Sequence, residues 1–316
     1  MIILRDDDPI SAQPSVVAIG VFDGAHRGHQ ALLAELVTLA RARGALATVI
    51  TFDPHPASVV APTHAPALLQ TLPQRLEALE RAGVDQVRLI TFDDAFAEIS
   101  AASFIADVIA GQLRAVAVLA GDDTQFGKGR SGTVAVLREL APRFNIEVFS
   151  APSFGDGVRF SSSRVRASLR VGDVVAASDV LGRPFVLRGE VVHGDARGRT
   201  IGYPTANVAF GPEQALPALG IYAGAVWAAG QWRCGAISVG KRPHFYDDGI
   251  VLVEVHIPDF SGDLYGDVID VAFLEWLRGE AAFDSLEALL AQIGRDVARS
   301  QEICGTFTPS SPFLLR

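Results

Sequence analysis

Two histidines lie three residues apart in the stretch GVFDGAHRGH, which runs from Gly20 to His29. The apolar run Ser15–Ile19 comes before this stretch, and leucines at helical spacing follow it. This pattern predicts that His26 and His29 lie at the opening of a helix, on one side of it. The free N–H groups and the positive dipole end of a helix start form a natural phosphate site. We therefore expect the two imidazoles to hydrogen-bond a phosphate as its charge rearranges.

Three further segments of the first half carry polar side chains. The run SSSRVR begins at residue 161, at an expected helix start, where hydroxyls and arginines are well suited to hold a polyphosphate. Its serines could also be helix caps, but capping needs only one serine and explains neither arginine. The segments TFDPHP, from Thr51, and GDDTQFGKGR, from Gly121, each follow a strand-like run. They could line a substrate site, although a rigid structural turn and a solvated loop are the alternatives.

The second half contains the dense segment GDARGRTIGYPTAN, from Gly194 to Asn207. Its glycines let the backbone approach a ligand, and its arginines add positive charge. Thr205 and Asn207 supply neutral oxygens, which Mg²⁺ accepts together with water and substrate phosphates. PTAN alone could also be a β-turn. Downstream, Glu254 interrupts an alternating apolar strand, where a carboxylate could deprotonate a primary hydroxyl.

The elements that must position the first group of residues alternate between strand and helix patterns. This rhythm predicts an α/β domain with a mostly parallel sheet, in which ligands bind at the carboxyl ends of the strands. The expected strands are Val16–Val21, Leu46–Phe52, Gln86–Phe92, Ala115–Ala120 and Asn145–Phe149, and the expected helices are His29–Arg43, Gln74–Ala82, Ala101–Gly111 and Val134–Leu140.

The rhythm changes near residue 183. A helix expected over Asp173–Leu181 ends at Gly182, and short strands separated by Gly and Pro turns follow, as in a small antiparallel barrel. An amphipathic helix over Asp284–Arg299, capped by Asp284 or Ser285, closes this half. The expected strands are Phe185–Val192, Tyr222–Ala228, Arg233–Val239, Ile250–His256 and Val268–Leu274. We therefore predict two domains, residues 1–182 and 183–316.

Composition narrows the class of protein. The 316 residues are 49% hydrophobic and 20% charged, which is typical of globular domains, and the net charge of -9 argues against broad nucleic-acid binding. The N-terminus lacks the pattern of a secretory signal, and no apolar run approaches the roughly 18 residues of a membrane span. Cys234 and Cys304 are isolated, so we expect reduced thiols in a cytoplasmic enzyme. No dinucleotide GxGxxG signature or GxxxxGK[ST] phosphate loop occurs.

GVFDGAHRGH, TFDPHP and SSSRVR together resemble the FMN adenylyltransferase module of bacterial bifunctional FAD synthetases, a Rossmann-like member of the HxGH nucleotidyltransferase superfamily. The resemblance implies that the FMN phosphate attacks the α-phosphorus of ATP, which releases pyrophosphate and forms FAD. It also implies that His26 and His29 are catalytic because they stabilise transition-state charge, and that neither is a nucleophile. The implied binding residues are Gly20, Phe22, Asp23, Gly24, Asp123, Ser162, Ser163, Arg164 and Arg166. The chain departs from the family at Thr124, usually aromatic, and at Gln125, often Arg.

GRTIGYPTAN, EVH and DLYG resemble the riboflavin kinase domain, a six-stranded barrel that follows the adenylyltransferase module in the same enzymes. The resemblance implies that ATP phosphorylates riboflavin to FMN, with Glu254 as the catalytic base for the ribityl 5′-hydroxyl. Thr205 and Asn207 would hold Mg²⁺ and the ATP phosphates. The implied binding residues are Gly194, Arg199, Gly202, Pro204, Thr205, Asn207 and Arg278. Lys241 and His244 stand where the family commonly has small hydroxyl residues.

The sequence thus predicts a bifunctional enzyme that converts riboflavin to FMN and FMN to FAD with two ATP and Mg²⁺. Two alternatives stay open: a riboflavin kinase whose first domain has lost FMN adenylylation, which Thr124 and Gln125 would explain, and a non-catalytic flavin-binding protein. The expected partners are ATP, riboflavin and FMN, without nucleic acid or membrane. No coiled-coil pattern occurs, so the oligomeric state stays open between a monomer and a weak homo-oligomer.

Overall fold

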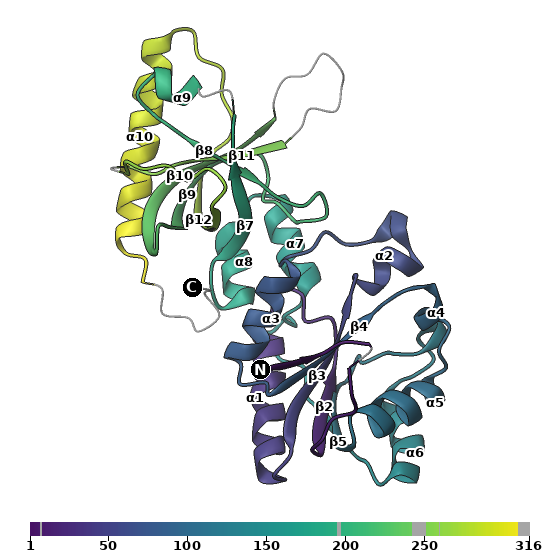
Figure 1. Ribbon diagram of the computed structural model, residues 1–316. Helices are drawn as coiled ribbons and strands as arrows, with labels where there is room; N and C mark the ends of the chain where they lie inside the picture. The colour runs from purple at the N-terminus through teal and green to yellow at the C-terminus, as the bar shows by residue number, and fades with distance from the viewer. Residues whose placement is uncertain (7, 195–196, 242–250, 259, 309–316) are drawn as a thin grey trace. The chain divides into compact units, whose positions relative to one another are not determined.

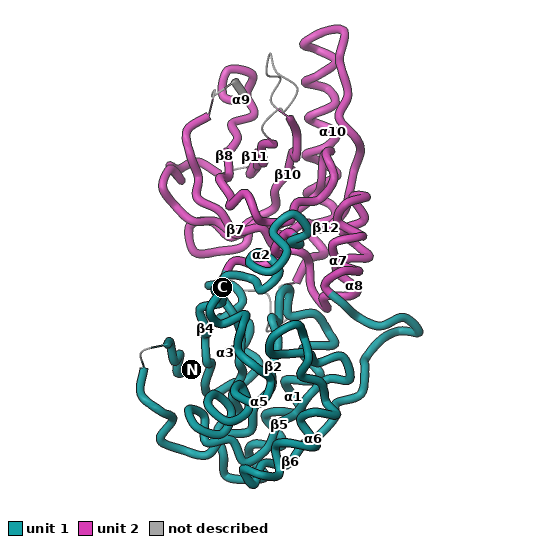
Figure 2. The backbone as a smooth tube through the Cα atoms, turned by 90° about the vertical axis from the view of Figure 1, so that its right-hand side faces the viewer, with its two compact units in different colours: residues 1–66, 72–161, 315 teal, residues 67–71, 162–314, 316 magenta. Residues whose placement is uncertain are grey.

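The computed structural model describes residues 1–6, 8–194, 197–241, 251–258 and 260–308, and these fall into two compact units. Unit 1 consists mainly of Met1–Pro66 and Leu72–Ser161, and unit 2 mainly of Ala67–Thr71 and Ser162–Leu314 (Figure 2). The short segment Ala67–Thr71 joins unit 2 because Leu68 bridges Gln214 in parallel fashion.

Unit 1 is built on a six-stranded sheet in the order β1–β4–β3–β2–β5–β6, in which every neighbouring pair is parallel. The strands are β1 (Ile2–Leu4), β2 (Ser15–Ile19), β3 (Leu46–Asp53), β4 (Gln86–Thr91), β5 (Ala115–Gly121) and β6 (Glu147–Ala151). The central strands are almost continuously apolar, because helices cover both faces of a parallel sheet. All carboxyl ends therefore meet at one edge, where we expected the ligand to bind.

Helices cover both faces of this sheet (Figure 1). Side chains of α1 (Arg27–Ala42) and α3 (Leu72–Arg81) pack on one face against Val16 and Ala18 of β2. On the other face, α5 (Ala101–Ser103), the π-helical segment η2 (Phe104–Gln112) and α6 (Val134–Leu140) pack against Val17. Shorter helical segments are α2 (Pro56–Val60), η1 (Pro62–His64), α4 (Asp94–Ala97), η3 (Lys128–Arg130) and η4 (Ala141–Phe144). The alternation of faces along β2 explains why Val16, Val17 and Ala18 are all buried although they join two separate cores.

Unit 2 is built on a closed barrel in the strand order β10–β11–β8–β7–β12–β9, with antiparallel pairing throughout. The strands are β7 (Phe185–Val192), β8 (Ala206–Ala209), β9 (Gly220–Ala228), β10 (Gln231–Lys241), β11 (Val251–His256) and β12 (Val268–Arg278). In β11, Val253 and Val255 are buried in the barrel, whereas Glu254 and His256 alternate with them on the other face. One strand thus supplies both the core and the polar surface.

Four helices accompany the barrel: α7 (Ser162–Arg170), α8 (Val174–Leu181), α9 (Arg197–Thr200) and α10 (Leu286–Gly305). Helix α10 lies along the barrel beside β9 and β10 (Figure 1). It begins after Ser285, whose hydroxyl accepts a hydrogen bond from the N–H of Ala288, so Ser285 rather than Asp284 is the cap. The two predicted fold classes, a parallel α/β domain and an antiparallel barrel with a terminal helix, are confirmed.

One expectation about the barrel was wrong. Cys234 of β10 and Cys304 of α10 form a disulfide, with their Cα atoms 5.5 Å apart, whereas the sequence predicted two reduced thiols. Seventy residues separate the two cysteines. Sequence spacing alone therefore does not reveal that α10 packs back onto β10 and brings the sulfur atoms together within an apolar cluster that includes Val186 and Ala225.

Candidate active sites

The two histidines of the first motif lie at the start of α1, as predicted. His26 is the N-cap, and its Nδ1 accepts a hydrogen bond from the backbone N–H of His29 at 3.3 Å. The two rings stack with centroids 3.6 Å apart and planes 19° apart. Because Nδ1 of His26 is an acceptor here, its Nε2 carries the proton and is the donor that a phosphate oxygen could meet.

The electrostatic surroundings keep His29 neutral. Burial lowers the pKa of His29 well below its usual 6.5, and the nearby His26 and Arg159 lower it further. Its Nδ1 is buried and has no hydrogen-bond partner among the described residues. A neutral imidazole can donate one hydrogen bond to a phosphate without giving up a proton to it. This arrangement suits stabilisation of charge rather than nucleophilic attack.

The turn before α1, residues 20–25, packs against the His29 ring through Phe22. Phe22 and Ala25 adopt positive φ angles of 56° and 40°, which are uncommon for residues other than glycine, and Gly24 has a φ of 83°. Phe22 is buried, and its ring centroid lies 5.1 Å from that of His29. A Cβ on Gly20 would lie 3.1 Å from the Phe22 ring, so glycine leaves room for it. Asp23 is also buried within the turn.

The loop after β5 contributes Asp123, which forms an ion pair with Arg159 at 2.6 Å. Arg159 forms an isolated antiparallel bridge with Gly155. The loop that contains this bridge therefore meets the loop after β5 at the ion pair with Asp123. Thr124, where the family usually has an aromatic residue, is partly buried, and Gln125 is exposed. The structure thus brings His26, His29 and Asp123 to the same edge of unit 1, through Arg159.

The hydroxyl and arginine run forms the first turns of α7. Ser162 begins the helix, and Ser163, Arg164 and Arg166 all keep solvent access. The Nε of Arg166 donates a 2.6 Å hydrogen bond to the carbonyl of Ala67. The serines and arginines at the start of α7 belong to unit 2, whereas His26 and His29 belong to unit 1. The chain leads into α7 from Phe160, whose ring lies under the Arg27 guanidinium of α1 at 4.8 Å.

The catalytic carboxylate expected in the barrel, Glu254, lies beside the two expected Mg²⁺ ligands. Asn207 of β8 pairs directly with Glu254 of β11, so their side chains share one face of the sheet. The Thr205 hydroxyl donates a 3.4 Å hydrogen bond to Glu254 Oε1. Thr205 and Asn207 offer neutral oxygens of the kind Mg²⁺ accepts, so the donor set fits this cation. Within the described ranges, no cluster of three or more His, Cys, Asp or Glu side chains could hold a metal ion.

Glycines let the preceding loop close over this face. A Cβ on Gly194 would lie 2.3 Å from Nδ2 of Asn207, and one on Gly198 would lie 2.2 Å from the carbonyl of Tyr203. Gly202 has a φ of 88°, which favours glycine. His256 Nδ1 lies 2.8 Å from the Pro204 carbonyl, so a hydrogen bond ties this loop to β11. Gly194, Gly202 and Pro204 therefore shape the loop that carries Thr205, and Arg199 is exposed in α9.

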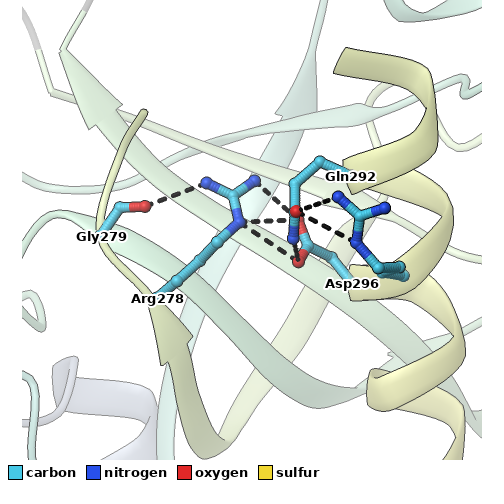
Figure 3. A network of polar contacts seen from close by, with 5 residues as sticks. Arg278, Gly279, Gln292 and Asp296 are labelled. Carbon is cyan, nitrogen blue, oxygen red and sulfur yellow. Dashed lines mark hydrogen bonds and ion pairs between the residues drawn. The ribbon is translucent and has the colours of Figure 1, made fainter. Parts of the chain in front are cut away.

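Arg278 lies at the far end of β12 and is held by α10 (Figure 3). Its Nη2 donates to Asp296 Oδ2 at 2.6 Å, its Nε contacts both carboxylate oxygens, and its Nη1 donates to the Gly279 carbonyl. Gln292 also donates to Asp296, at 2.8 Å. Along the paired strands, Ile221 lies between Arg278 and Ser238, and Ser238 pairs with Glu254. The structure therefore does not bring Arg278 into direct contact with the carboxylate.

Three residues of these sites were missed by the sequence reasoning: Arg159, His256 and Asp296. The sequence carried a signal for Asp296, because it falls on the apolar face of its helix, three residues after Ile293, where a buried carboxylate needs a partner.

Lys241 ends β10 and is exposed, and His244 lies outside the described residues. No helix in the described part of the chain is long and apolar enough to cross a membrane.

Two family models match successive parts of this chain. Residues 8–164 match the family model for FAD synthetase, and residues 181–304 match the one for riboflavin kinase. The bifunctional riboflavin kinase/FMN adenylyltransferase of Escherichia coli K12 is 40% identical over 298 residues, which cover 93% of this chain and 94% of that protein. The protein of the same name from Pseudomonas fluorescens is 38% identical over 91% of this chain and 92% of its own length.

A solved structure described as a macrolide-efflux protein from Streptococcus pneumoniae superposes with a TM-score of 0.86 at 34% identity, over 98% of this chain and 100% of that one. The predicted resemblance and the predicted pair of activities are confirmed by the two family models and by the full-length relatives. This chain belongs to the family of bifunctional riboflavin kinase/FMN adenylyltransferases.

Proposed function

We propose that unit 2 phosphorylates riboflavin with Glu254 as the general base. The Glu254 carboxylate takes the proton from the ribityl 5′-hydroxyl, whose oxygen then attacks the γ-phosphorus of ATP while ADP leaves. Thr205 and Asn207 would hold Mg²⁺, which neutralises phosphate charge when bound. Gly194, the exposed Arg199 and the segment from Gly202 to Pro204 would lie against the nucleotide. The 3.4 Å contact between Thr205 and Glu254 supports this assignment.

In the adenylyl-transfer step, an FMN phosphate oxygen attacks the α-phosphorus of ATP and pyrophosphate leaves. His26 and His29 would donate hydrogen bonds to phosphate oxygens as charge moves onto the leaving group. The glycine turn would hold phosphate through its backbone, and Asp123 would lie close to the nucleotide. Ser162, Ser163, Arg164 and Arg166 would bind phosphates from the start of α7.

This proposal keeps the functional boundary between residues 182 and 183, with α7 serving the adenylyl-transfer step. It also includes a cytoplasmic location and leaves a weak homo-oligomer open. The observation that carries the proposal is the placement of Glu254 beside both Thr205 and Asn207, because a strand carboxylate flanked by two neutral oxygen donors suits phosphoryl transfer to a hydroxyl.

The test incubates purified protein with riboflavin and Mg·ATP and resolves the flavins by chromatography. Wild-type protein should accumulate FAD. Glu254→Ala should lower FMN formation by roughly 10²- to 10⁴-fold while FAD still forms from supplied FMN. His29→Ala should instead stop the pathway at FMN. Glu190→Gln and His64→Ala, at exposed positions, are matched controls and should behave like wild type.

Each outcome distinguishes one reading from another. A wild-type reaction that stops at FMN would favour the kinase with an impaired first domain, and unchanged riboflavin would favour the non-catalytic flavin-binding protein. Loss of both activities in folded Glu254→Ala protein would contradict two separate sites.

A further inference from the structure

Arg75 is a buried arginine of α3 that neither proposed step uses. Its residue is 5% exposed, and it lies under the carboxyl ends of β2 and β3. The Nη1 group donates to the Val21 carbonyl at 3.2 Å, and the Nη2 group donates to the Phe52 carbonyl at 2.9 Å. Nε has no hydrogen-bond partner among the described residues, so the hydrogen bonds of this guanidinium come from its two Nη groups.

The two carbonyls lie just past the point where β2 and β3 stop pairing with each other. The last paired residues of β2 and β3 are Ile19 and Ile50, and Val21 and Phe52 each lie two residues further along. Beyond this point β3 continues, whereas the segment after β2 turns away toward His26 and His29. The guanidinium therefore joins the two backbones just past the end of the β2–β3 ladder, and its planar fork fixes the geometry of both contacts.

Charge keeps this buried guanidinium in place. Burial lowers the pKa of Arg75, whereas the nearby carboxylates of Asp23 and Asp53 act in the opposite direction. Asp53 Oδ1 lies 3.8 Å from Nη2. Asp23 belongs to the turn that follows β2, and Asp53 is the last residue of β3, so the charge of Arg75 is attracted to both places.

The turn that Arg75 holds supports His29. Val21 accepts a second hydrogen bond, from the Thr51 hydroxyl at 3.0 Å, so its carbonyl is fixed from two directions. The next residue, Phe22, has the φ of 56°, and such backbone persists only where the surroundings impose it. The Phe22 ring then lies against the His29 ring. A contiguous path of contacts thus leads from Arg75 through Val21 and Phe22 to His29.

We propose that Arg75 is a positioning residue for adenylyl transfer, which fixes the Val21–Phe22 turn and thereby the orientation of the His29 imidazole. The inference rests on the proposed role of His29. Arg75 itself touches neither substrate nor the reacting atoms. Its replacement should therefore lower the rate of FAD formation more than it weakens substrate binding.

The test uses full-length Arg75→Lys, with Arg81→Lys as the control from the exposed part of the same helix. Lysine keeps the charge but lacks the planar fork that holds the two carbonyls in a fixed geometry. For FAD formation from supplied FMN, kcat should fall roughly 10- to 100-fold, while the KM values for ATP and FMN stay within about threefold. FMN formation by unit 2 should stay at the wild-type level, and an unchanged circular-dichroism spectrum should report that unit 1 is folded. Arg81→Lys should leave both activities unchanged.

Two measurements separate positioning from a purely structural role. The His29 ring resonance of the wild type should titrate well below pH 6.5, whereas in Arg75→Lys it should move toward 6.5 as the ring leaves its buried place. Thr51→Val, which removes one of the two bonds to Val21, should lower kcat in the same direction but less. The proposal is overturned if Arg75→Lys keeps kcat within about twofold of wild type, or if only the KM for ATP rises. Should Arg75→Lys fail to fold, an unchanged kcat in Thr51→Val overturns it. A wild type that forms no FAD would instead refute the proposed function.

Discussion

Removal of the Cys234–Cys304 disulfide should destabilise the barrel of unit 2 selectively. The bridge closes a loop with a sequence separation of 70 residues. For a loop of that length, the loss of chain entropy in the unfolded state corresponds to about 4 kcal/mol, an upper figure because the unfolded chain retains some structure. Replacing both cysteines by serine also places hydroxyls in the apolar cluster around Cys304. We expect a loss of about 2–4 kcal/mol in the free energy of unfolding.

The protein offers its own probe for this change. All three tryptophans, Trp227, Trp232 and Trp276, lie in unit 2, so their fluorescence during urea unfolding reports the barrel alone. With a urea dependence of about 2 kcal/mol per M, the midpoint of the double serine variant should fall by roughly 1–2 M. Wild-type protein treated with dithiothreitol should shift in the same direction.

Two results would refute this reasoning. The first is an oxidised wild type that already titrates with two free thiols under denaturing conditions. The second is a urea midpoint that is the same for wild type and the double serine variant. FAD formation from supplied FMN serves as the control, because unit 1 contains neither cysteine and should keep its activity.

Three further predictions concern buried polar groups. Asp270→Asn leaves the Arg188 guanidinium, which Asp270 binds at 2.6 and 2.8 Å, buried without its counter-charge, so tryptophan-monitored unfolding should show a loss of about 3–5 kcal/mol. Tyr222→Phe removes the hydroxyl that donates to the Ala218 carbonyl at 2.5 Å; the same assay should show a loss of about 1 kcal/mol, and the ionisation with a pKa of about 12 should disappear from an ultraviolet pH titration. The lowered pKa of His29 means that the unfolded chain takes up a proton near pH 6.5 before the folded chain does, so the stability of unit 1 should be full above pH 6.5 and decline as the pH falls below it. His29→Gln should flatten this part of the pH profile, and an unchanged slope in circular dichroism melts would contradict the assignment.

Periodicity predicted the long elements well, because burial on one face imposes it. The alternation of strand and helix in unit 1 and the short strands of the barrel were both recognisable from apolar spacing. Two strands were missed: β1 has only three residues, and β8, which begins inside PTAN at Ala206, has only four. Such short segments contain too few residues to show a period of two.

Contacts between distant residues were not predictable in the same way. The disulfide depends on α10 folding back onto β10, and the pair of Arg159 with Asp123 depends on two loops meeting. The burial of Arg75 was recognisable from the sequence, because Arg75 lies three residues after Leu72 and four before Leu79, on the apolar face of its helix. A charged residue at such a position predicts a buried partner, although the sequence does not say which one.

The two faces of β11 have a consequence for how this barrel can change over evolutionary time. Because side chains alternate along a strand, inserting or deleting one residue before Glu254 would turn the carboxylate toward the barrel interior and bring Val253 or Val255 to the reactive face. A substitution in β11 therefore alters one side chain, and a second substitution can compensate for it. A change in the length of β11 instead displaces the Glu254 carboxylate and the buried valines together. We expect length variation among relatives to collect in the connecting loops and to leave this strand with a constant number of residues.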